Sequence, residues 1–591
     1  MSYSQPSDLR WLEPVQDDVW LQQIIEEFHV HPVVAQIFVS RGFGTLKDIH
    51  SFLYAGLRDL YDPYLFVDMT RAVDRLVMAR KKGEKVIIYG DTDVDGMTAA
   101  ALLVDYLTVI GVQAFPFLPS RDSRSNEMQE GLQYAKSIGS TLVITVDCGI
   151  TAAAEIALFA AEGIDVIVTD HHEPTHKIPH CLATLNPKLL DGAYPNRDLT
   201  GVGVAFKLIH AVTSYLVKTK KLPAKKVNLE SYLDLVALGT IADMAPLLGE
   251  NRIFARFGLK RLAQTRRLGL LKLFEVCDID PGKGISALDV ASKIAPRLNS
   301  IGRIDEGRKG VQLLLASDWD EAARLAQELD EQNTERQKIE RQMSEHLEEM
   351  IASDPSCIEE PMIVLSSEQW HPGVVPILSA RLAKQYSRPV CLIAVENGVG
   401  KGSMRTIPQF PLLPMLHESS DILIDYGGHD FAAGLTINAG DVSAFAKAAK
   451  SYAQNHLSDL DLATQLQIDA AVSFTDLNFE LLDALSLFEP YGHDNPPPIF
   501  SSLVKQNWPP KVVSGNHLKV YLEEGGRMLE GIGFGMADMK ASLKRKSLQI
   551  AAAFTPQVNR FLNKTSIQLL IRSLQILPET KKIPTSKGSG D

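Results

Sequence analysis

The chain has 591 residues, enough for three or four domains, and its 45% hydrophobic and 22% charged residues exclude an intrinsically disordered protein. Its formal net charge of −12 argues against a nucleic-acid-binding protein, because phosphate contacts require Lys and Arg. Acidic metal ligands would themselves lower the total, however, so the sign of the charge does not decide the function.

The cysteine content and the N-terminal residues indicate the cellular compartment in which the protein is expected. The five cysteines are odd in number and lack C-x-x-C spacing, which favours a reducing compartment over a disulfide framework or a zinc site. The N-terminus lacks a charged start followed by an apolar core, and no apolar run is long enough to span a membrane. We therefore expect a cytoplasmic protein with no membrane partner.

Residues 1–50 are predicted to form a helical N-terminal extension. From Lys85 onward, short apolar runs alternate with helical segments, which predicts an α/β fold with a doubly wound parallel sheet. The expected strands are Val86–Tyr89, Val112–Leu118, Leu142–Val146 and Val166–Thr169, and the expected helices are Thr98–Gly111, Met128–Ile138 and Thr151–Gly163.

Three carboxylates stand between the first of these strands and its helix. Asp91, Asp93 and Asp95 would repel one another in a low-dielectric site, and a divalent cation is the simplest group to neutralise them. This edge of an open parallel sheet is also where ligands bind. A solvated acidic turn is one alternative. A calcium-binding loop is another, but its twelfth position, which needs an acid, would be Leu102.

Two later strands also end in polar residues. Asp147 follows one, and Asp170, His171 and His172 follow the other. Because parallel strands place their carboxyl ends on one edge, these groups can converge on the triple-Asp segment. Helix capping alone does not explain three such strand ends, so the pattern favours a metal site. Asp243, near the end of an apolar helix, needs a partner too, either a metal or a salt bridge.

Three further segments could contact phosphates. The glycines of Leu199–Lys207 fit either a phosphate site or close helix packing. Four-residue spacing places Arg252, Arg256 and Lys260 on one helix face, which could contact phosphates but is more often solvated. Ile294–Arg303 is expected to be a polar loop with side chains suited to phosphate or sugar oxygens, namely Arg297, Asn299 and Arg303.

The second half of the chain begins with a highly charged segment, Asp318–Ser353, which predicts a linker helix on the order of 50 Å long. In the region after it, Gly400–Thr406 is predicted to be a glycine-rich loop that cradles an anion with Lys401 and Arg405. Gly427-Gly-His429 is expected to lead into a helix that starts at Phe431–Gly434. Short strand-like runs from 466 to 578 suggest an oligonucleotide-binding (OB) barrel, and the tail from 581 to 591 is expected to be disordered.

Together, these motifs resemble the DHH phosphoesterase superfamily and its companion DHHA1 domain. The DHH part rests on Asp91-x-Asp-x-Asp-Gly, Asp147-Cys-Gly, Asp170-His-His and Asp243, and the DHHA1 part on Gly400-Lys-Gly-Ser and Gly427-Gly-His429. Five other motifs resemble the RecJ family of bacterial single-stranded-DNA-specific exonucleases: Leu235–Asp243, Ala295–Asn299, Trp370–Gly373, Pro490–Pro496 and His517–Lys519.

The resemblance implies a division of the chain and a set of functional residues. The implied division is an N-terminal extension (1–50), a DHH catalytic domain (51–317), a linker helix (318–353), a smaller α/β DHHA1 domain (354–460), an OB-like nucleic-acid-binding domain (461–578) and a tail (579–591). It also implies two Mn²⁺ or Mg²⁺ ions held by Asp91, Asp93, Asp95, Asp147, His171 and Asp243, with Asp147 bridging. His172 would face the scissile phosphate, and Asp170 would orient it.

The implied substrate-contacting residues are spread over both halves of the chain. They are Arg121, Asn299, Arg303, Trp370, His371, Lys401, Ser403, Arg405, Gly428 and His429, of which Arg303, Arg405 and His429 would hold phosphates. The chain also departs from the family pattern. The loop that begins at Arg121 lacks the usual Gly-Tyr-Gly, Thr92 replaces an aromatic residue, Pro376 replaces a glycine and Met404 replaces a small residue.

By this resemblance, we expect a monomeric 5′-to-3′ exonuclease for single-stranded DNA that acts in repair and recombination. A single-strand-binding protein and a RecQ-type helicase are partners implied only by the resemblance. One alternative is a DHH–DHHA1 phosphoesterase for short oligonucleotides or cyclic dinucleotides, which would lack the barrel. Another is a non-catalytic replication scaffold, which would have lost metal ligands.

Overall fold

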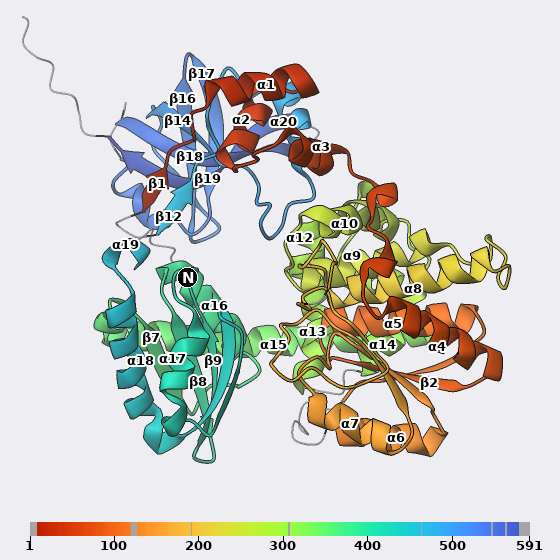
Figure 1. Ribbon diagram of the computed structural model, residues 1–591. Coiled ribbons are helices and arrows are strands. Elements are labelled where there is room, and N and C mark those ends of the chain that lie inside the picture. Colours follow the sequence, from red (N-terminus) through yellow and green to blue (C-terminus); the bar gives the residue numbers. More distant parts are fainter. Residues whose placement is uncertain are drawn as a thin grey trace, which may run out of the picture.

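The structure is a computed structural model that describes residues 9–119, 127–190, 192–304, 308–462, 464–544, 548–561 and 564–577. Arg121 and the tail expected from 579 to 591 lie outside these ranges, and so does the side chain of Arg303. The domain expected to be catalytic (51–317, here called the catalytic-side domain) and the smaller α/β domain (354–460) lie at one end of the molecule, and a β-barrel lies at the other (Figure 1). No helix in the described ranges is long and apolar enough to cross a bilayer.

The first domain is built on a parallel five-stranded sheet, which confirms the predicted fold class. The strand order is β3-β2-β4-β5-β6, and the strands span Gln113–Phe117, Lys85–Gly90, Leu142–Val146, Asp165–Thr169 and Ala183–Leu185. Alternate residues face two different apolar cores: Ile87 and Val143 face one, and Ile88 and Ile144 the other. Both faces are therefore covered, as in a doubly wound fold.

This domain also contains a series of helices. They are α4 (Met69–Lys82), α5 (Val94–Val109), α6 (Glu127–Ile138), α7 (Ala153–Ala161), α8 (Gly201–Lys218), α9 (Leu233–Ala242), α10 (Gly249–Leu262), α11 (Leu268–Val276), α12 (Ala287–Asp289), α13 (Ala295–Ile304) and α14 (Arg308–Leu315). Helix α5 begins four residues earlier than predicted, because the side chain of Asp93 caps it by accepting a hydrogen bond from the Gly96 N–H at 3.0 Å. Asp95 therefore lies in the first helical turn.

The expected polar loop at 294–303 is wrong, because this segment forms helix α13. Pro296 would normally break a helix, since it has no N–H to donate. A π-helical turn, Val290–Ile294, precedes it and takes up the altered hydrogen bonding. Arg297, suggested as a phosphate contact, instead pairs with Asp330 at 2.8 Å. It thereby fixes α13 against the long helix α15.

Helix α15 spans Trp319–Ser353, which confirms the predicted linker helix. Its first half packs into the catalytic-side core through residues such as Leu325 and Leu329. Its second half packs into the smaller domain through Met343 and Leu347. The helix therefore belongs to both cores and fixes the separation of the two domains.

The smaller domain has a mixed sheet in the order β10-β11-β9-β8-β7. Its strands are β7 (Ile363–Ser367), β8 (Val390–Glu396), β9 (Val399–Arg405), β10 (Asp425–Gly428) and β11 (Ala432–Asn438), and its helices are α16 (Val375–Tyr386), α17 (Leu412–Glu418), α18 (Val442–His456) and α19 (Asp459–Leu462). The predicted glycine-rich loop is strand β9, and the helix predicted to start at 431–434 is strand β11. A Cβ at Gly400 would lie 2.7 Å from Ile393, so these glycines serve close packing in a sheet.

The C-terminal strands form the expected barrel. The sheet runs β13-β14-β18-β19-β17-β16-β15, and an additional pairing of β14 with β16 brings its two ends together. The strands are β13 (Ala470–Ala471), β14 (Phe500–Gln506), β15 (Lys511–Val513), β16 (His517–Glu524), β17 (Arg527–Gly533), β18 (Leu548–Phe561) and β19 (Lys564–Ile576), with helix α20 at Phe479–Leu485.

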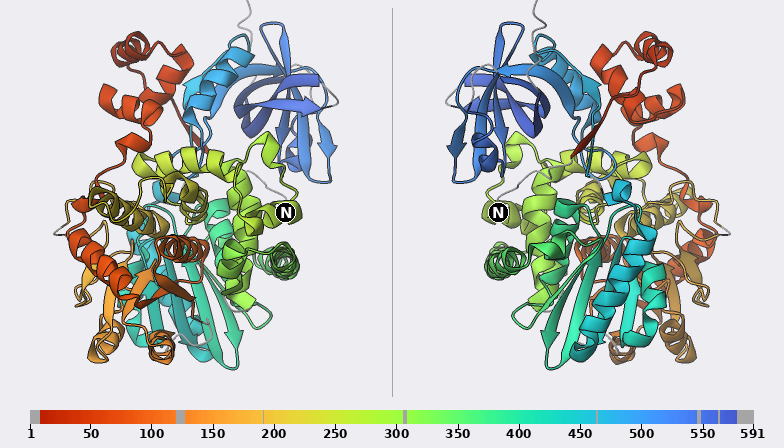
Figure 2. Two further views of the ribbon diagram at one scale, coloured as in Figure 1. Left: turned by 90° about the vertical axis from the view of Figure 1, so that its right-hand side faces the viewer. Right: turned by 90° about the vertical axis from the view of Figure 1, so that its left-hand side faces the viewer.

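The N-terminal helices pack against this barrel, a contact that the sequence did not predict. Helices α1 (Asp18–Phe28), α2 (Pro32–Ser40) and α3 (Leu46–Tyr54) share one apolar core with strands of the barrel (Figure 2). Strand β1 (Arg10–Leu12) pairs in parallel with β12 (Gln465–Gln467). Residues more than 400 positions apart thus form a single unit, which we call the barrel unit.

Arg252 on α10 ties the barrel unit to the catalytic-side domain. Its guanidinium, 3% exposed, donates to the backbone oxygens of Phe52, Leu487 and Phe488 at 2.8–3.0 Å and stacks 3.7 Å from the centre of the Phe52 ring. Burial, helped by nearby Arg256, lowers the pKa of Arg252 to about 9. The expected solvated or phosphate-binding face is therefore wrong at this position, where the arginine is a structural contact.

Replacing Arg252 should loosen the barrel unit. Arg252→Met keeps the apolar stem but leaves three carbonyl groups without their donor, so we expect the free energy of unfolding to fall by about 2–4 kcal/mol. Arg252→Lys should recover little, because one ammonium cannot reproduce the planar fork. Denaturant titration measures the loss, with Lys260→Ala, an exposed change on the same helix, as the control. A native midpoint for Arg252→Met would contradict this role.

Candidate metal centre

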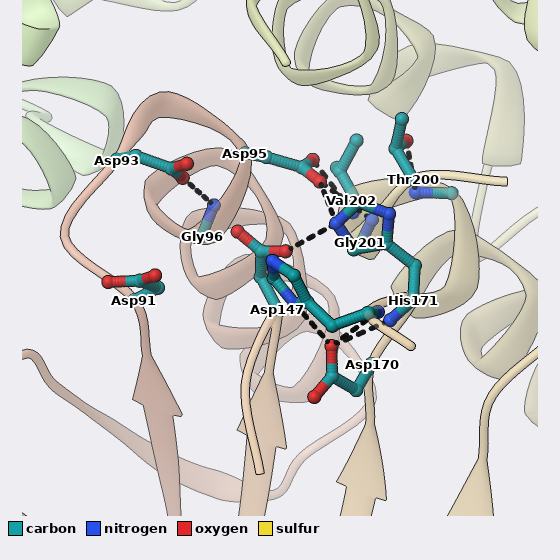
Figure 3. Close-up of polar contacts among 12 residues, drawn as sticks. Asp91, Asp93, Asp95, Gly96, Asp147, Asp170, His171, Thr200, Gly201 and Val202 are labelled. Carbon is teal, nitrogen blue, oxygen red and sulfur yellow. Dashed lines mark hydrogen bonds and ion pairs between the residues drawn. The ribbon is translucent and has the colours of Figure 1, made fainter. Parts of the chain in front are cut away.

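The polar residues predicted at three strand ends do converge. Asp91 and Asp93 follow β2, Asp147 follows β4, and Asp170 and His171 follow β5, all at the carboxyl edge of the parallel sheet (Figure 3). The first turn of α5 adds Asp95, and the C-cap of α9 adds Asp243. The convergence follows from the parallel topology, which places every strand's carboxyl end on the same edge.

Two groups of possible ligands share this edge, and a third overlaps both. Asp91, Asp93 and Asp147 have ligand atoms within 4.8 Å of one another, and so do Asp95, His171 and Asp243; the overlapping group is Asp147, His171 and His172. The groups adjoin where Asp147 Oδ1 lies 3.0 Å from His171 Nε2. Neither of these two buried atoms has a hydrogen-bond partner among the described residues. Carboxylate oxygens with one imidazole nitrogen suit Mn²⁺ or Mg²⁺. The donor set therefore fits divalent metal binding, with Asp147 placed between the two groups.

The electrostatics of the cluster also favour a cation. Asp95 and Asp147 are each 1% exposed, and burial together with neighbouring carboxylates raises the pKa of both well above the usual range. Burial, then the charge of Asp93, raises the pKa of Asp243 to about 7. His171 behaves oppositely: burial, then His172, lowers its pKa to about 3. The imidazole is therefore neutral and ready to act as a ligand.

The N-terminus of α8 holds Asp95 in place. Asp95 accepts hydrogen bonds from the Gly201 N–H at 2.6 Å and from the Val202 N–H at 2.9 Å, one on each carboxylate oxygen (Figure 3). Unpaired N–H groups and the helix dipole make a helix N-terminus an anion site. The glycine segment at 199–207 thus binds an anion, as one of its two interpretations proposed, but the anion is a side chain of the same protein.

Two glycines leave room for the carboxylates, a role that the sequence analysis assigned to neither. A Cβ at Gly201 would lie 2.7 Å from Asp147 Oδ1, and a Cβ at Gly239 would lie 2.8 Å from Asp95 Oδ1. Such contacts are too short for real Cβ atoms. The only sequence signal was a small residue within each apolar segment, which ordinary helix packing would also explain.

His172 forms a second feature beside the cluster. Its Nδ1 lies 2.8 Å from Asp170 Oδ1. Burial by itself would lower the pKa of His172, but the hydrogen bond to Asp170 and the charge of Asp170 raise it to about 9. Asp170 also accepts the Ile150 N–H at 2.8 Å, which fixes its carboxylate. Asp170 and His172 are therefore in direct contact, and the orienting role expected of Asp170 stays a prediction.

The smaller domain contributes one residue that contacts His172. His429 stacks on His172 with ring centres 5.8 Å apart and an angle of 9° between the rings. It stands at the tip of the β10–β11 hairpin, where its N–H donates to the Ala432 oxygen at 2.8 Å. Gly428, next to it, has φ +139°, a conformation that side chains rarely adopt. The hairpin thus places His429 against His172 of the catalytic-side domain.

The remaining predicted substrate residues make other contacts. Arg405 donates to Ser403 Oγ at 3.3 Å along β9, and Lys401 on the same strand is exposed. Trp370 is 2% exposed in the core between α15 and α16, and the adjacent His371 accepts the Gly373 N–H at 3.1 Å. Asn299 on α13 accepts the Val94 N–H at 3.2 Å and so supports the start of α5. Their contacts with substrate stay predictions.

Comparison with known proteins places the chain in a family. Family models match it in three segments: the DHH family N-terminal domain at 85–240, the DHHA1 domain at 359–455 and the RecJ OB domain at 468–573. The single-stranded-DNA-specific exonuclease RecJ of Bacillus subtilis is 34% identical over 96% of this chain and 71% of its own length. RecJ of Salmonella typhimurium is 32% identical over 91% of this chain and 95% of its own.

The chain belongs to the RecJ family. Among solved structures, RecJ of Thermus thermophilus in complex with Mn²⁺ matches with a TM-score of 0.82 at 29% identity, over 98% of this chain and 81% of that one. The Mg²⁺ complex of the same protein matches with a TM-score of 0.74 at 27% identity, over 97% and 79%. The RecJ-family architecture of DHH, DHHA1 and OB domains is thus present in order.

The raised carboxylate pKa values predict that metal binding depends on pH. Metal ions bind the ionised carboxylates, so protons compete below the raised pKa values. With the pKa of Asp243 at about 7, Mn²⁺ affinity should fall steeply from about pH 8 to about pH 6, whereas His171, neutral throughout, contributes nothing to the decline. Calorimetric Mn²⁺ titrations in buffers of different ionisation enthalpy would also detect the released protons. Constant affinity over this range would contradict the prediction.

A methyl group at Gly201 should disturb the centre without unfolding the domain. The methyl group of Gly201→Ala would clash with the Asp147 carboxylate and displace it. We therefore expect the affinity for Mn²⁺ to fall by about 10–100-fold. Titration by electron paramagnetic resonance measures the affinity, and circular dichroism checks the fold. Gly44→Ala is the matched control, because no atom lies within 4 Å of its added Cβ. Native affinity in Gly201→Ala would show that the position tolerates a side chain.

Proposed function

We propose that this protein is a metal-dependent exonuclease that hydrolyses phosphodiester bonds of single-stranded DNA from the 5′ end, in DNA repair and recombination. The observation that carries the proposal is the buried cluster of carboxylates and one neutral imidazole at the sheet edge, in a chain of the RecJ family. The relatives are named single-stranded-DNA-specific exonucleases. A cluster of this charge has no evident structural use, because it destabilises the metal-free fold.

The proposed cofactor is Mn²⁺ or Mg²⁺, as two ions. The residues that would hold them are Asp91, Asp93, Asp95, Asp147, His171 and Asp243. Such ions supply an activated water at neutral pH and stabilise the charge of a leaving oxygen. Solved RecJ structures from Thermus thermophilus contain Mn²⁺ or Mg²⁺, which supports this choice. Asp147 Oδ1 and His171 Nε2, buried without partners in the described residues, have the free lone pairs that the role requires.

The protein's own part is to hold the phosphate and position charge. With a pKa of about 9, His172 carries a proton at neutral pH and can donate to a phosphate oxygen. Asp170 keeps the ring in one orientation through Nδ1, which leaves Nε2 for the substrate. His429 faces the same ring from the smaller domain, so a phosphate bound there would contact both domains. A phosphate at this position would thus be held where the two domains meet.

The ligand, the partners, the oligomeric state, the location and the domain boundaries are proposed on the family resemblance. Single-stranded DNA is the proposed macromolecular ligand, supported by the match to the RecJ OB domain. A single-strand-binding protein and a RecQ-type helicase as partners, a monomeric state and a cytoplasmic location are further proposals. The domain boundaries 51–317, 318–353, 354–460 and 461–578 are also proposed; the three family matches fall within them.

The two alternatives have less support. A phosphoesterase for short oligonucleotides or cyclic dinucleotides would not need the barrel, yet the barrel is built into the fold through the N-terminal helices and Arg252. A non-catalytic scaffold would not need metal ligands, yet every predicted ligand is present and lies in the cluster. Both observations favour the exonuclease.

The decisive assay uses a single-stranded oligonucleotide labelled at either end, with Mn²⁺. A 5′ label should appear at once as mononucleotide, whereas a 3′ label should pass through a ladder of shortening products. Asp147→Ala should reduce the rate by more than about 100-fold, because even residues behind metal ligands cost 10–100-fold. Asp483→Ala, an exposed acid on the barrel unit, is the control. Absence of degradation by the native protein, or equal rates with Asp147→Ala, would overturn the proposal.

A further inference from the structure

The end of strand β6 adds a fourth set of polar residues to the sheet edge that carries the metal centre. Strand β6 lies parallel to β5, with Leu185 beside Thr169 in the register, and the Asp170 N–H donates to the Leu185 oxygen at 3.0 Å. Because parallel strands end on one edge, the residues that follow β6 leave the sheet next to those that follow β5. Three residues there have no part in the proposed reaction: Asn186, Pro187 and Lys188.

The backbone of Lys188 is fixed to the backbone of His172. Asn186, which is 2% exposed, donates from Nδ2 to the His172 oxygen at 2.9 Å and accepts the Lys188 N–H on Oδ1 at 2.7 Å. The Arg197 guanidinium donates to the Lys188 oxygen at 3.1 Å, and Pro187 has a restricted φ. One buried amide thus joins the lysine to the histidine, and the Lys188 side chain starts from a fixed position beside His172.

The ammonium of Lys188 is held by an exposed carboxylate. Its one ion pair within the part of the chain that the structure describes is with Glu173, at 3.1 Å. The Glu173 side chain is 60% exposed and the Lys188 side chain 20% exposed. An ion pair this open to water contributes little to stability. The ammonium can therefore leave Glu173 for another anion at small cost.

The charge of Lys188 acts on the metal centre and on the stacked histidines. After burial and the charge of His172, Lys188 is the next cause that lowers the pKa of His429. Burial and then Asp93 raise the pKa of Asp243, and His172 and then Lys188 oppose this rise. A cation that acts on both side chains lies close to the place where His172 meets His429. That place is where the proposed reaction puts a phosphate.

We infer that Lys188 is a further substrate-contacting residue, whose ammonium leaves Glu173 to bind a phosphate oxygen of the strand beside His172. The inference rests on the proposed function, because it takes the ligand to be a nucleic-acid phosphate. The imidazolium of His172 and the ammonium of Lys188 would then donate to one phosphate from the same domain. Hydrogen bonds between charged groups are about twice as strong as those between neutral ones. Glu173 binds the ammonium in the free protein and so competes with the strand.

Opposite charge changes at the ion pair test the inference. With Mn²⁺ and a labelled oligothymidine, Lys188→Gln should raise KM about 10-fold, because a charged donor is lost. Glu173→Gln should lower KM about 2–5-fold, because it frees the ammonium. If the pair were only structural, either variant would break it and KM would move in the same direction. That outcome, or a native KM for Lys188→Gln, would overturn the inference.

The chain offers a matched control for this comparison. Lys272 pairs with Glu275 on α11 at 2.8 Å, and the two side chains are 23% and 62% exposed, much like the pair at β6. Lys272→Gln should leave KM at the native value. Lys188→Arg, which keeps the charge, should recover most of the loss; failure of this rescue would overturn a role that depends on charge.

Two further measurements need no cleavage. Without DNA, Lys188→Gln should bind Mn²⁺ about 2–5-fold more tightly than the native protein, because a positive charge near Asp243 is removed. Electron paramagnetic resonance measures this affinity, and a weaker affinity would indicate a displaced strand end and overturn the inference. With Mn²⁺ bound, Lys188→Gln should bind thymidine 5′-monophosphate about 10-fold more weakly by calorimetry, and equal affinities would overturn the phosphate contact. If this loss appeared while the native protein failed to shorten strands, the proposed function would fail and the contact would stand.

Discussion

Repulsion among buried carboxylates is the constraint around which the catalytic-side domain is built. Asp95 and Asp147 are almost fully buried, and burial together with neighbouring carboxylates raises the pKa of both, so the fold must supply compensation nearby. The N-terminus of α8 supplies part of it through the Gly201 and Val202 N–H groups. The remaining free lone pairs, on Asp147 and His171, point to a bound cation for the rest. Helix α8 provides the N–H groups, strand β4 ends next to Asp147, and Gly201 and Gly239 leave room for the carboxylates.

Function in this protein depends on joining groups from distant segments. The charged His172 meets His429 of the smaller domain, and helix α15 sets the spacing because it belongs to both cores. On the other side, Arg252 binds three backbone oxygens of the barrel unit. The carboxylate cluster, the two stacked histidines and the barrel thus have fixed relative positions. A single strand gripped at all three would be held at several points along its length, which suits an enzyme that removes nucleotides from an end.

Errors in the sequence reading share one physical origin. Glycine-rich β9 and alanine-rich β11 have compositions typical of a loop and a helix, yet pairing with strands on both sides makes them sheet. The polar residues at 294–303 suggested a loop, but this segment is helix α13, which the Arg297–Asp330 pair fixes against the distant helix α15. The spacing of Arg252 suggested a solvated face, but the barrel unit covers it. In each case, a contact with a remote segment overrode a correct local tendency.

The sequence by itself determined the parallel sheet, the linker helix and the convergence of Asp91, Asp93, Asp147 and His171. These follow from strand–helix alternation and from the rule that parallel strands end on one edge, both of which are local or topological patterns. Only the tertiary structure decided which backbone groups hold Asp95, why Gly201 and Gly239 lack side chains, and that the N-terminal helices complete the barrel's core. Those features depend on distances between residues far apart in the chain, and no periodicity or composition encodes such distances.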